Sequence, residues 1–161
     1  TPVIRGADRA PGWPAGVVGA ITHADGLALA AVAHRRDHGG LGVDLEHLRG
    51  VRRLAIADKV ADASERAWIA AGPEPRRRLA ALFSAKEAVY KALYPRVGRY
   101  FGFSAVSGRF ADGAFHFTLR QPLGAGYPAG AQVRVPARWH GDRVLTTLCL
   151  PPDPPPAPER P

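Results

Sequence analysis

One long helix, predicted over residues 76–93, constrains the fold of this chain more than any other feature of the sequence. Leu79, Leu82 and Phe83 recur at helical spacing and would form one apolar face. Pro95 is expected to end the helix, because proline cannot donate a backbone hydrogen bond and restricts the residue before it. A helix with such a face has to pack against another element, so the chain must supply a surface that covers it.

The same helix places charged residues among its apolar ones. Phe83, Glu87 and Lys91 lie at positions i, i+4 and i+8, so one face of the helix holds a carboxylate between an aromatic ring and an ammonium group. Lys86 is a further cation on this helix. Taken alone, Glu87 and Lys91 would form a salt bridge worth roughly a few tenths of a kcal/mol. Lysines on such a face can also extend their ammonium groups into water.

A second acidic segment, Gly-Val-Asp-Leu-Glu, lies upstream of the helix. Asp44 and Glu46 are two residues apart in a strand-like run, so both carboxylates project from one side of the strand. One interpretation is an exposed strand edge with solvated acids. If strand and helix meet, Asp44, Glu46 and Glu87 are the hard oxygen ligands that Mg²⁺ prefers. Together with Lys86 and Lys91 they have the makings of a magnesium-assisted phosphoryl-transfer site.

The rest of the chain predicts strands before and after two helices. A further helix is expected over residues 54–71, where alanine is frequent and Gly72-Pro73 would stop it. Strands are expected over residues 16–21, 27–33, 42–46, 103–110, 114–120, 131–139 and 143–150, with Asp25-Gly26 as a hairpin turn. This order predicts an α+β fold in which the helices pack against an antiparallel sheet.

The composition indicates a globular protein with an acidic partner. The chain of 161 residues has a formal net charge of +8, which suits a polyphosphate cofactor, an acidic carrier protein or nucleic acid. An arginine-rich composition can equally reflect a GC-rich genome. No apolar run reaches the length of a membrane span and no signal peptide heads the chain. The single cysteine, Cys149, is expected to be a buried thiol, and the expected location is cytoplasmic.

Three blocks of sequence carry a family resemblance. They are Trp13-Pro14 followed by Ile21-Thr22-His23, then Gly42-Val43-Asp44-Leu45-Glu46, and then Phe83-Ser84-Ala85-Lys86-Glu87 followed by Lys91. In this order and spacing they resemble the signature of 4′-phosphopantetheinyl transferases of the surfactin- and enterobactin-synthetase-activating type. The likeness covers roughly residues 5–95 and fades in the last third of the chain.

The resemblance implies two pseudo-twofold-related α/β lobes with the active site in the cleft between them. Residues 1–49 would be the remaining part of the N-terminal lobe with a coenzyme-binding loop, and residues 50–150 would be the C-terminal lobe. Members of this branch carry a further N-terminal segment with basic residues. The N-terminal lobe and the coenzyme site are therefore expected to be incomplete here. Residues 151–161 are proline-rich and are expected to be disordered.

The reaction that the resemblance implies is transfer of the 4′-phosphopantetheine arm of coenzyme A to a serine of an acyl or peptidyl carrier protein. Asp44, Glu46 and Glu87 would hold Mg²⁺. Glu87, directly or through a water, would take the proton of the serine, and Lys91 would stabilise charge on the departing adenosine 3′,5′-bisphosphate. Carrier proteins of this kind commonly present acidic helices, which match the basic charge of the chain. The protein is expected to be a monomer without a nucleic-acid or membrane partner.

The resemblance also assigns contacts to the coenzyme. Thr22 and His23 would bind its 3′-phosphate with Arg5 as a partner, and Lys86 and Lys91 would neutralise its pyrophosphate. Taken alone, a histidine after a strand is more often a capping residue, and a loop arginine is usually solvated.

Two other functions remain open. One is another Mg²⁺-dependent phosphotransferase or phosphohydrolase, although the sequence has no P-loop. The other is a basic nucleic-acid-binding module, although the arginines are dispersed and no zinc-finger or basic-zipper pattern occurs. A chain without the further N-terminal segment could also keep the fold and catalyse only weakly.

Overall fold

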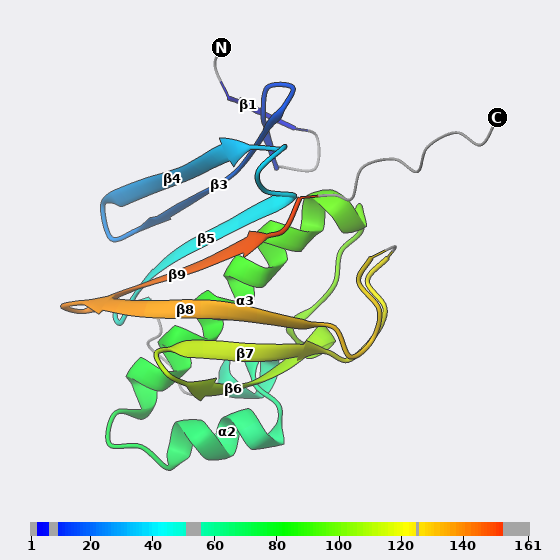
Figure 1. The fold of residues 1–161 in the computed structure, drawn as a ribbon. Coiled ribbons are helices and arrows are strands. Elements are labelled where there is room, and N and C mark those ends of the chain that lie inside the picture. The colour runs from blue at the N-terminus through cyan, green and yellow to red at the C-terminus, as the bar shows by residue number, and fades with distance from the viewer. Residues whose placement is uncertain (1–2, 7–9, 51–55, 125, 153–161) are drawn as a thin grey trace.

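A computed structural model describes residues 3–6, 10–50, 56–124 and 126–152 (Figure 1). Its strands and helices follow one another along the chain as β1 (Ile4–Arg5), β2 (Pro11–Gly12), β3 (Val17–Ala24), β4 (Leu27–His34), β5 (Gly40–His47), α1 (Ala57–Val60), α2 (Ala63–Ala70), α3 (Pro75–Val97), β6 (Val106–Ala111), β7 (Ala114–Leu119), β8 (Gln132–His140) and β9 (Arg143–Leu150). A short 3₁₀ turn, Phe103–Ala105, precedes β6. The α+β class with antiparallel sheets is confirmed.

A five-stranded antiparallel sheet and the long helix α3 form the centre of the molecule. The strands are ordered β5-β9-β8-β7-β6, and α3 crosses one face of this sheet (Figure 1). The predicted apolar helix face is buried here against alternate residues of the strands. The largest fully buried side chains between helix and sheet are Leu79, Leu82, Val89 and Leu93 from α3 and Phe115, Phe117, Leu119, Val135 and Val144 from the strands.

Strand β5 approaches α3 closely because two of its residues are glycines. A Cβ atom at Gly42 would collide with the carbonyl oxygen of Ala88, and one at Gly40 would lie 2.7 Å from the carbonyl oxygen of Ala92. Both glycines therefore let the strand backbone rest on the helix. This contact sets the distance between the acidic residues of β5 and the charged face of α3.

The predicted hairpin of β3 and β4 is confirmed. Asp25 and Gly26 both have positive φ angles, 47° and 77°, which suits a two-residue hairpin turn. The hairpin lies beside β5 (Figure 1), and the backbone N–H of Leu45 donates to the Thr22 hydroxyl oxygen at 2.9 Å. Val18, Ala20 and Thr22 are buried on the side of β3 that faces the rest of the molecule.

The single helix predicted over residues 54–71 is wrong. The chain forms α1, leaves the helical conformation at Ala61, and starts α2 with Asp62 as its N-cap. Asp62 accepts a hydrogen bond from the Glu65 backbone N–H at 2.9 Å, and Glu65 accepts one from the Asp62 N–H at 2.8 Å. This reciprocal capping box stabilises a helix start inside the alanine-rich stretch. Residues 54 and 55 lie outside the described part of the chain.

The predicted end of α3 at Pro95 is also wrong. The helix continues to Val97 and ends at Gly98, whose φ of 67° is left-handed. The N–H of Gly98 donates to the carbonyl oxygen of Tyr94 at 2.9 Å, so the last turn closes around the proline. A proline this close to the helix end removes only one hydrogen bond, and the glycine terminates the helix instead.

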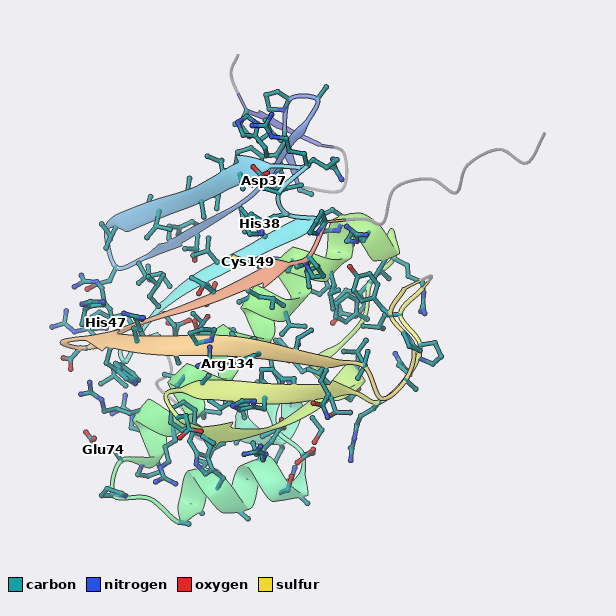
Figure 2. The ribbon with its side chains drawn as sticks, viewed as in Figure 1. Asp37, His38, His47, Glu74, Arg134 and Cys149 are labelled. Atoms are coloured by element: carbon teal, nitrogen blue, oxygen red, sulfur yellow. The ribbon has the colours of Figure 1, made fainter. Side chains whose placement is uncertain are left out.

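Cys149 is exposed, which corrects the expectation of a buried thiol. Side chains alternate along a strand, and Leu148 and Leu150 are the neighbours that point into the core. Figure 2 labels Cys149, which lies on β9 opposite Leu41 of β5. None of the described helices is long and apolar enough to cross a membrane.

The sequence predicts one lobe over residues 1–49 and another over residues 50–150. In the structure, β5, which precedes this boundary, is part of the same sheet as the strands that follow it. β5 pairs with β9 from Gly40 opposite Leu150 to His47 opposite Arg143, so β5 belongs to the same sheet as β6–β9. The β3–β4 hairpin forms a separate two-stranded sheet. Most of the predicted tail, residues 153–161, lies outside the described part of the chain.

Candidate active site between strand β5 and helix α3

The side chains of β5 and α3 interlock beside the acidic residues. Asp44 lies opposite Thr146 of β9. The hydroxyl of Ser84 on α3 donates to the backbone carbonyl oxygen of Asp44 at 3.3 Å and lies 2.9 Å from the Thr146 hydroxyl. All three residues are buried. This small polar network fixes the helix against the strand at the position where the site forms.

Asp44 is the centre of the site. It is 6% exposed, and its Oδ1 accepts hydrogen bonds from Lys91 Nζ at 2.7 Å and from the Thr22 hydroxyl at 3.1 Å. Lys91 Nζ also donates to the carbonyl oxygen of Val43 at 3.3 Å. The ion pair of Lys91 is therefore with Asp44 on the neighbouring strand, whereas the sequence suggested a pair with Glu87 on the same helix. Oδ2 of Asp44 is buried and has no hydrogen-bond partner among the described residues.

Glu87 and Glu46 interact electrostatically with Asp44 and Lys91. Burial raises the pKa of Glu87, and the negative charges of Asp44 and Glu46 raise it further, while Lys91 opposes the shift. Burial also raises the pKa of Glu46, although its Oε1 accepts a hydrogen bond from the His47 backbone N–H at 2.9 Å. Negative charge thus exceeds positive charge at this site, and both glutamates favour their neutral form more than usual.

These residues suit a divalent cation. Carboxylate oxygens are the ligands that Mg²⁺ prefers, and the unpaired Asp44 Oδ2 and the two glutamates with raised pKa would all be stabilised by a nearby positive charge. Within the described residues, however, no three His, Cys, Asp or Glu side chains come close enough to form a ready metal-binding cluster. One or two carboxylates are sufficient for Mg²⁺ when phosphate oxygens and water complete its coordination.

A groove of about 720 Å³ opens next to these carboxylates. From α3 it is lined by Glu87, Tyr90, Lys91 and Tyr94, and from the N-terminal region by residues that include Trp13, Gly19, Ile21 and Arg35. Its volume is in the range of sites that bind small molecules. A Cβ atom at Gly19 would lie 2.7 Å from the Trp13 ring. The glycine therefore lets the indole lie flat on β3 and form one wall of the groove.

The side chains of Thr22 and His23 lie in different surroundings and do not form one phosphate site. Thr22 is 3% exposed, and its hydroxyl is occupied by Asp44 and by the N–H of Leu45. His23 is exposed and lines a different concavity of about 440 Å³, together with Glu46, His47 and Arg49. Thr22 thus orients Asp44, and only His23 remains in a position to meet a phosphate in solution. The side chain of Arg5 lies outside the described part of the structure.

Lys86 does not lie at the site. Its side chain is 1% exposed and forms an ion pair of 2.7 Å with Glu65 of α2, and it donates to the carbonyl oxygen of Val60 at 2.8 Å. Further acceptors are the carbonyl oxygens of Phe103 and Val106, each at 3.3 Å. The expectation that Lys86 contacts a coenzyme does not fit this geometry, because its ammonium is enclosed in the core on another side of the helix.

Comparisons with known proteins identify the family. A family model described as the 4′-phosphopantetheinyl transferase superfamily matches residues 40–149, and a model of the 4′-phosphopantetheinyl transferase N-terminal domain matches residues 1–33. The first match alone covers more than half of the chain. The chain belongs to the 4′-phosphopantetheinyl transferase superfamily. The family resemblance drawn from the three sequence blocks is thereby confirmed.

Individual transferases are similar over most of this chain. It is 35% identical to the 4′-phosphopantetheinyl transferase Npt of Nocardia iowensis over 73% of this chain and 57% of that protein. It is 41% identical to the 4′-phosphopantetheinyl transferase Svp of Streptomyces mobaraensis over 74% of this chain and 49% of that protein. The chain therefore spans about half the length of the curated transferases that it matches.

Solved structures show the same fold. The holo-[acyl-carrier-protein] synthase of Thermotoga maritima aligns with a TM-score of 0.58 and 21% identity, over 71% of this chain and 64% of that one. The corresponding synthase of Neisseria meningitidis aligns with a TM-score of 0.53 and 20% identity, over 70% of this chain and 97% of that one. At this level of identity the similarity shows the fold of a phosphopantetheinyl transferase and nothing finer.

Several residues that line the groove and the neighbouring concavity were not predicted from the sequence. Tyr90 and Tyr94 follow Glu87 at helical spacing, so the periodicity that joined Glu87 to Lys91 also placed them on the groove side. Trp13 was noticed as part of a motif but not as a groove wall. Arg49 gave no signal, because nothing in its sequence distinguishes it from other surface arginines.

Proposed function

We propose that this protein transfers the 4′-phosphopantetheine arm of coenzyme A to a serine of a carrier protein, in a reaction that depends on Mg²⁺. The observation that carries the proposal is that Glu87 and Lys91 line a groove of about 720 Å³, that Lys91 is paired with Asp44, and that Glu46 lines a neighbouring concavity. Membership of the transferase superfamily supports the reaction class.

Asp44, Glu46 and Glu87 are the candidate ligands of the Mg²⁺ ion. Because they do not form a ready cluster of three, phosphate oxygens of the coenzyme and water would supply much of its coordination. When bound, the ion would neutralise negative charge on the pyrophosphate and on the leaving group. Lys91 serves the same purpose with a fixed ammonium, which Asp44 holds at 2.7 Å and the Val43 carbonyl at 3.3 Å. Thr22 fixes the Asp44 carboxylate through its hydroxyl.

Glu87 is the general base of the proposed reaction. The serine oxygen forms a bond to the phosphorus that carries the pantetheine, and the bond from that phosphorus to the bridging oxygen breaks. The bridging oxygen leaves with adenosine 3′,5′-bisphosphate and takes the bonding electrons, while the serine proton passes to Glu87. Burial and the neighbouring carboxylates raise the pKa of Glu87 in the protein without a metal, which favours acceptance of a proton by this carboxylate.

The phosphates of the coenzyme have candidate partners on both sides of Glu46. Lys91 lines the large groove, and His23 and Arg49 line the neighbouring concavity. We assign the 3′-phosphate to His23 and Arg49, because His23 is exposed there and arginine suits a phosphate better than lysine does. The acceptor is a carrier protein with an acidic surface, and the protein acts as a monomer.

An intact-mass measurement tests the reaction. An apo carrier protein is incubated with the protein, coenzyme A and Mg²⁺, and a mass gain of one phosphopantetheine arm is expected. Incubation without coenzyme A, and incubation with EDTA, serve as controls and should leave the carrier unchanged. A magnesium-dependent phosphotransferase of another kind would leave the carrier mass unchanged even with all components present, and that result would remove the proposal.

A further inference from the structure

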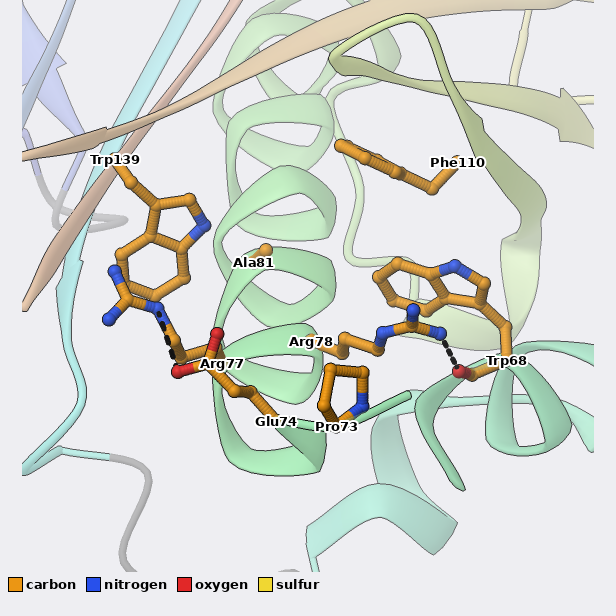
Figure 3. Close-up of a pocket in the computed structure, with 8 residues that line it drawn as sticks. All are labelled: Trp68, Pro73, Glu74, Arg77, Arg78, Ala81, Phe110 and Trp139. Atoms are coloured by element: carbon orange, nitrogen blue, oxygen red, sulfur yellow. Dashed lines mark hydrogen bonds and ion pairs between the residues drawn. The ribbon is translucent and has the colours of Figure 1, made fainter. Parts of the chain in front are cut away.

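A slot between two tryptophans lies at the N-terminal end of α3, outside the groove described above. Figure 3 shows Trp139 on one side of the helix and Trp68 on the other, with Ala81 between them. We call this the tryptophan slot; it encloses about 400 Å³, and Phe110, Arg77 and Arg78 also line it. Nothing in the reaction proposed above uses these residues.

The walls of the tryptophan slot are held in place by arginines. The guanidinium of Arg77 stacks 4.1 Å from the Trp139 ring centroid and donates to the carbonyl oxygen of Gly141 at 2.7 Å. Arg78 stacks 4.9 Å from the Trp68 ring and donates to the Trp68 carbonyl oxygen at 2.5 Å. Because both rings are already fixed, an apolar side chain could enter between them at little ordering cost.

The floor and the charge of the slot define what fits there. Ala81 contributes only a methyl group, so the space between the rings is open to a large apolar side chain. Arg77 lies 3.8 Å from the carboxylates of Glu74 and Asp142, whereas Arg78 takes part in no ion pair among the described residues. With Arg76 beside them, the rim carries more positive than negative charge. The complementary ligand is an apolar side chain flanked by carboxylates.

A continuous path joins the tryptophan slot to the catalytic carboxylates. A concavity of about 480 Å³, lined by residues that include Arg49, Arg76 and Arg77, adjoins the slot at Arg77. The concavity that contains Glu46 adjoins it in turn at Arg49. We call these three connected hollows the docking trough. Along α3, Ala81 and Glu87 are six residues apart, which corresponds to about 9 Å of helix axis.

We propose that the docking trough binds the acceptor protein of the transfer reaction. The acceptor inserts one large apolar side chain into the tryptophan slot and presents carboxylates to Arg76 and Arg77, while its serine reaches the site at Glu87. Tryptophan and arginine are among the residues that most often dominate binding energy at protein interfaces, and here two tryptophans line the slot while arginines line the hollows beside it. This inference rests on the proposed function for the identity of the acceptor.

Two variants and two matched controls test the trough. Arg77→Glu reverses a charge on its rim, and Trp139→Ala removes one wall of the slot. Arg134→Glu makes the same charge change on the opposite face of the sheet, where Arg134 is exposed (Figure 2), and Trp139→Phe keeps an aromatic wall. We expect Arg77→Glu and Trp139→Ala to raise KM for an apo acyl carrier protein by about tenfold or more. KM for coenzyme A and kcat should change by less than about twofold, and both controls should resemble the wild type.

Direct binding separates the docking surface from the reaction. Fluorescence anisotropy of a labelled acyl carrier protein, with its acceptor serine replaced by alanine, needs no turnover. Loss of binding in Arg77→Glu but not in Arg134→Glu supports the trough even if no transfer occurs, in which case only the proposed reaction fails. Equal weakening by both arginine variants, unchanged binding in Arg77→Glu, or no binding by the wild type would overturn it. Displacement of the carrier from the wild type by single-stranded DNA, with the same dependence on Arg77, would also overturn it.

Discussion

At the scale of single residues, the site assigns two glutamates and one aspartate different tasks through their surroundings. Asp44 is held by Lys91 and Thr22 and keeps one oxygen without a partner among the described residues. Glu87 and Glu46 are each half-buried near other negative charges and have raised pKa values. Asp44 is thus a carboxylate held in one position, whereas the surroundings of Glu46 and Glu87 favour uptake of a proton or, as proposed, of a metal ion.

Glu87→Gln separates the catalytic role of this residue from a structural one. The amide keeps the shape of the side chain but removes the proton acceptor and one metal-binding charge. Single-turnover transfer to a carrier protein should fall by about a hundredfold or more, the usual scale of general acid–base catalysis. The Tm of the same variant at neutral pH should be equal to or above that of the wild type. Transfer at the wild-type rate would exclude Glu87 from the mechanism.

The raised pKa values of Glu46 and Glu87 also predict how stability depends on pH. In the folded protein both carboxyls hold their protons to a higher pH than in the unfolded chain, where their pKa is ordinary. Between the ordinary and the raised values the folded state binds more protons, so these two groups make the protein less stable as the pH rises through that window. Denaturant unfolding across pH 4–7 should show this slope, and it should flatten in a double Glu46→Gln, Glu87→Gln variant. An equal slope in the variant would contradict the assignment.

At the scale of elements, the packing of α3 decides which of its charged residues reach the site. Lys86 and Glu87 are neighbours in sequence but point about 100° apart around a helix. The sequence predicted both at the active site, Lys86 at the coenzyme and Glu87 at the metal, because nothing local tells which of the two faces the core. The contact of α3 with β5 turns Glu87 and Lys91 toward Asp44, and it turns Lys86 toward α2 and Glu65.

The fold could be predicted where local signals were sufficient. The turn at Asp25-Gly26 and the paired carboxylates of β5 follow from short patterns, and the structure has both. The Asp62–Glu65 capping box was equally local, but the alanine-rich composition around it was given more weight. The positions of Thr22 and Arg49 could not be predicted, because they depend on contacts between segments far apart in the chain.

Lys86→Met tests whether this lysine is structural. The substitution leaves Glu65 as an unpaired charge in the core, which should cost about 3–5 kcal/mol of unfolding free energy. Adding Glu65→Gln should restore part of this stability, because the neutral amide removes the unpaired charge and its carbonyl oxygen can still accept from the Asp62 N–H. Urea unfolding of both variants measures the effect. In the double variant, KM for coenzyme A should remain near the wild-type value, whereas a large increase would return Lys86 to the coenzyme site.

At the scale of the whole molecule, the chain has a net charge of +8, whereas the candidate site contains three carboxylates. The excess acidity is local and would serve the proposed Mg²⁺ ion, while the basic residues along the proposed docking trough would act on a partner at a distance. Electrostatic attraction of this kind increases the rate of association and is weakened by salt. The two charge patterns therefore predict different responses to ionic strength.

KM for an acidic carrier protein should rise steeply as the salt concentration increases from about 0.05 to 0.5 M, because exposed charges are screened over about 10 Å at 0.1 M and over less at higher salt. The salt dependence should be shallower in Arg77→Glu, which loses one positive charge of the trough and gains a negative one. Arg134→Glu should keep nearly the full slope, since its charge lies on the other face of the sheet. Steady-state transfer at several salt concentrations measures all three proteins. A KM for the carrier protein that does not change with salt in the wild type would indicate an apolar docking surface, in which the tryptophan slot acts without its arginines.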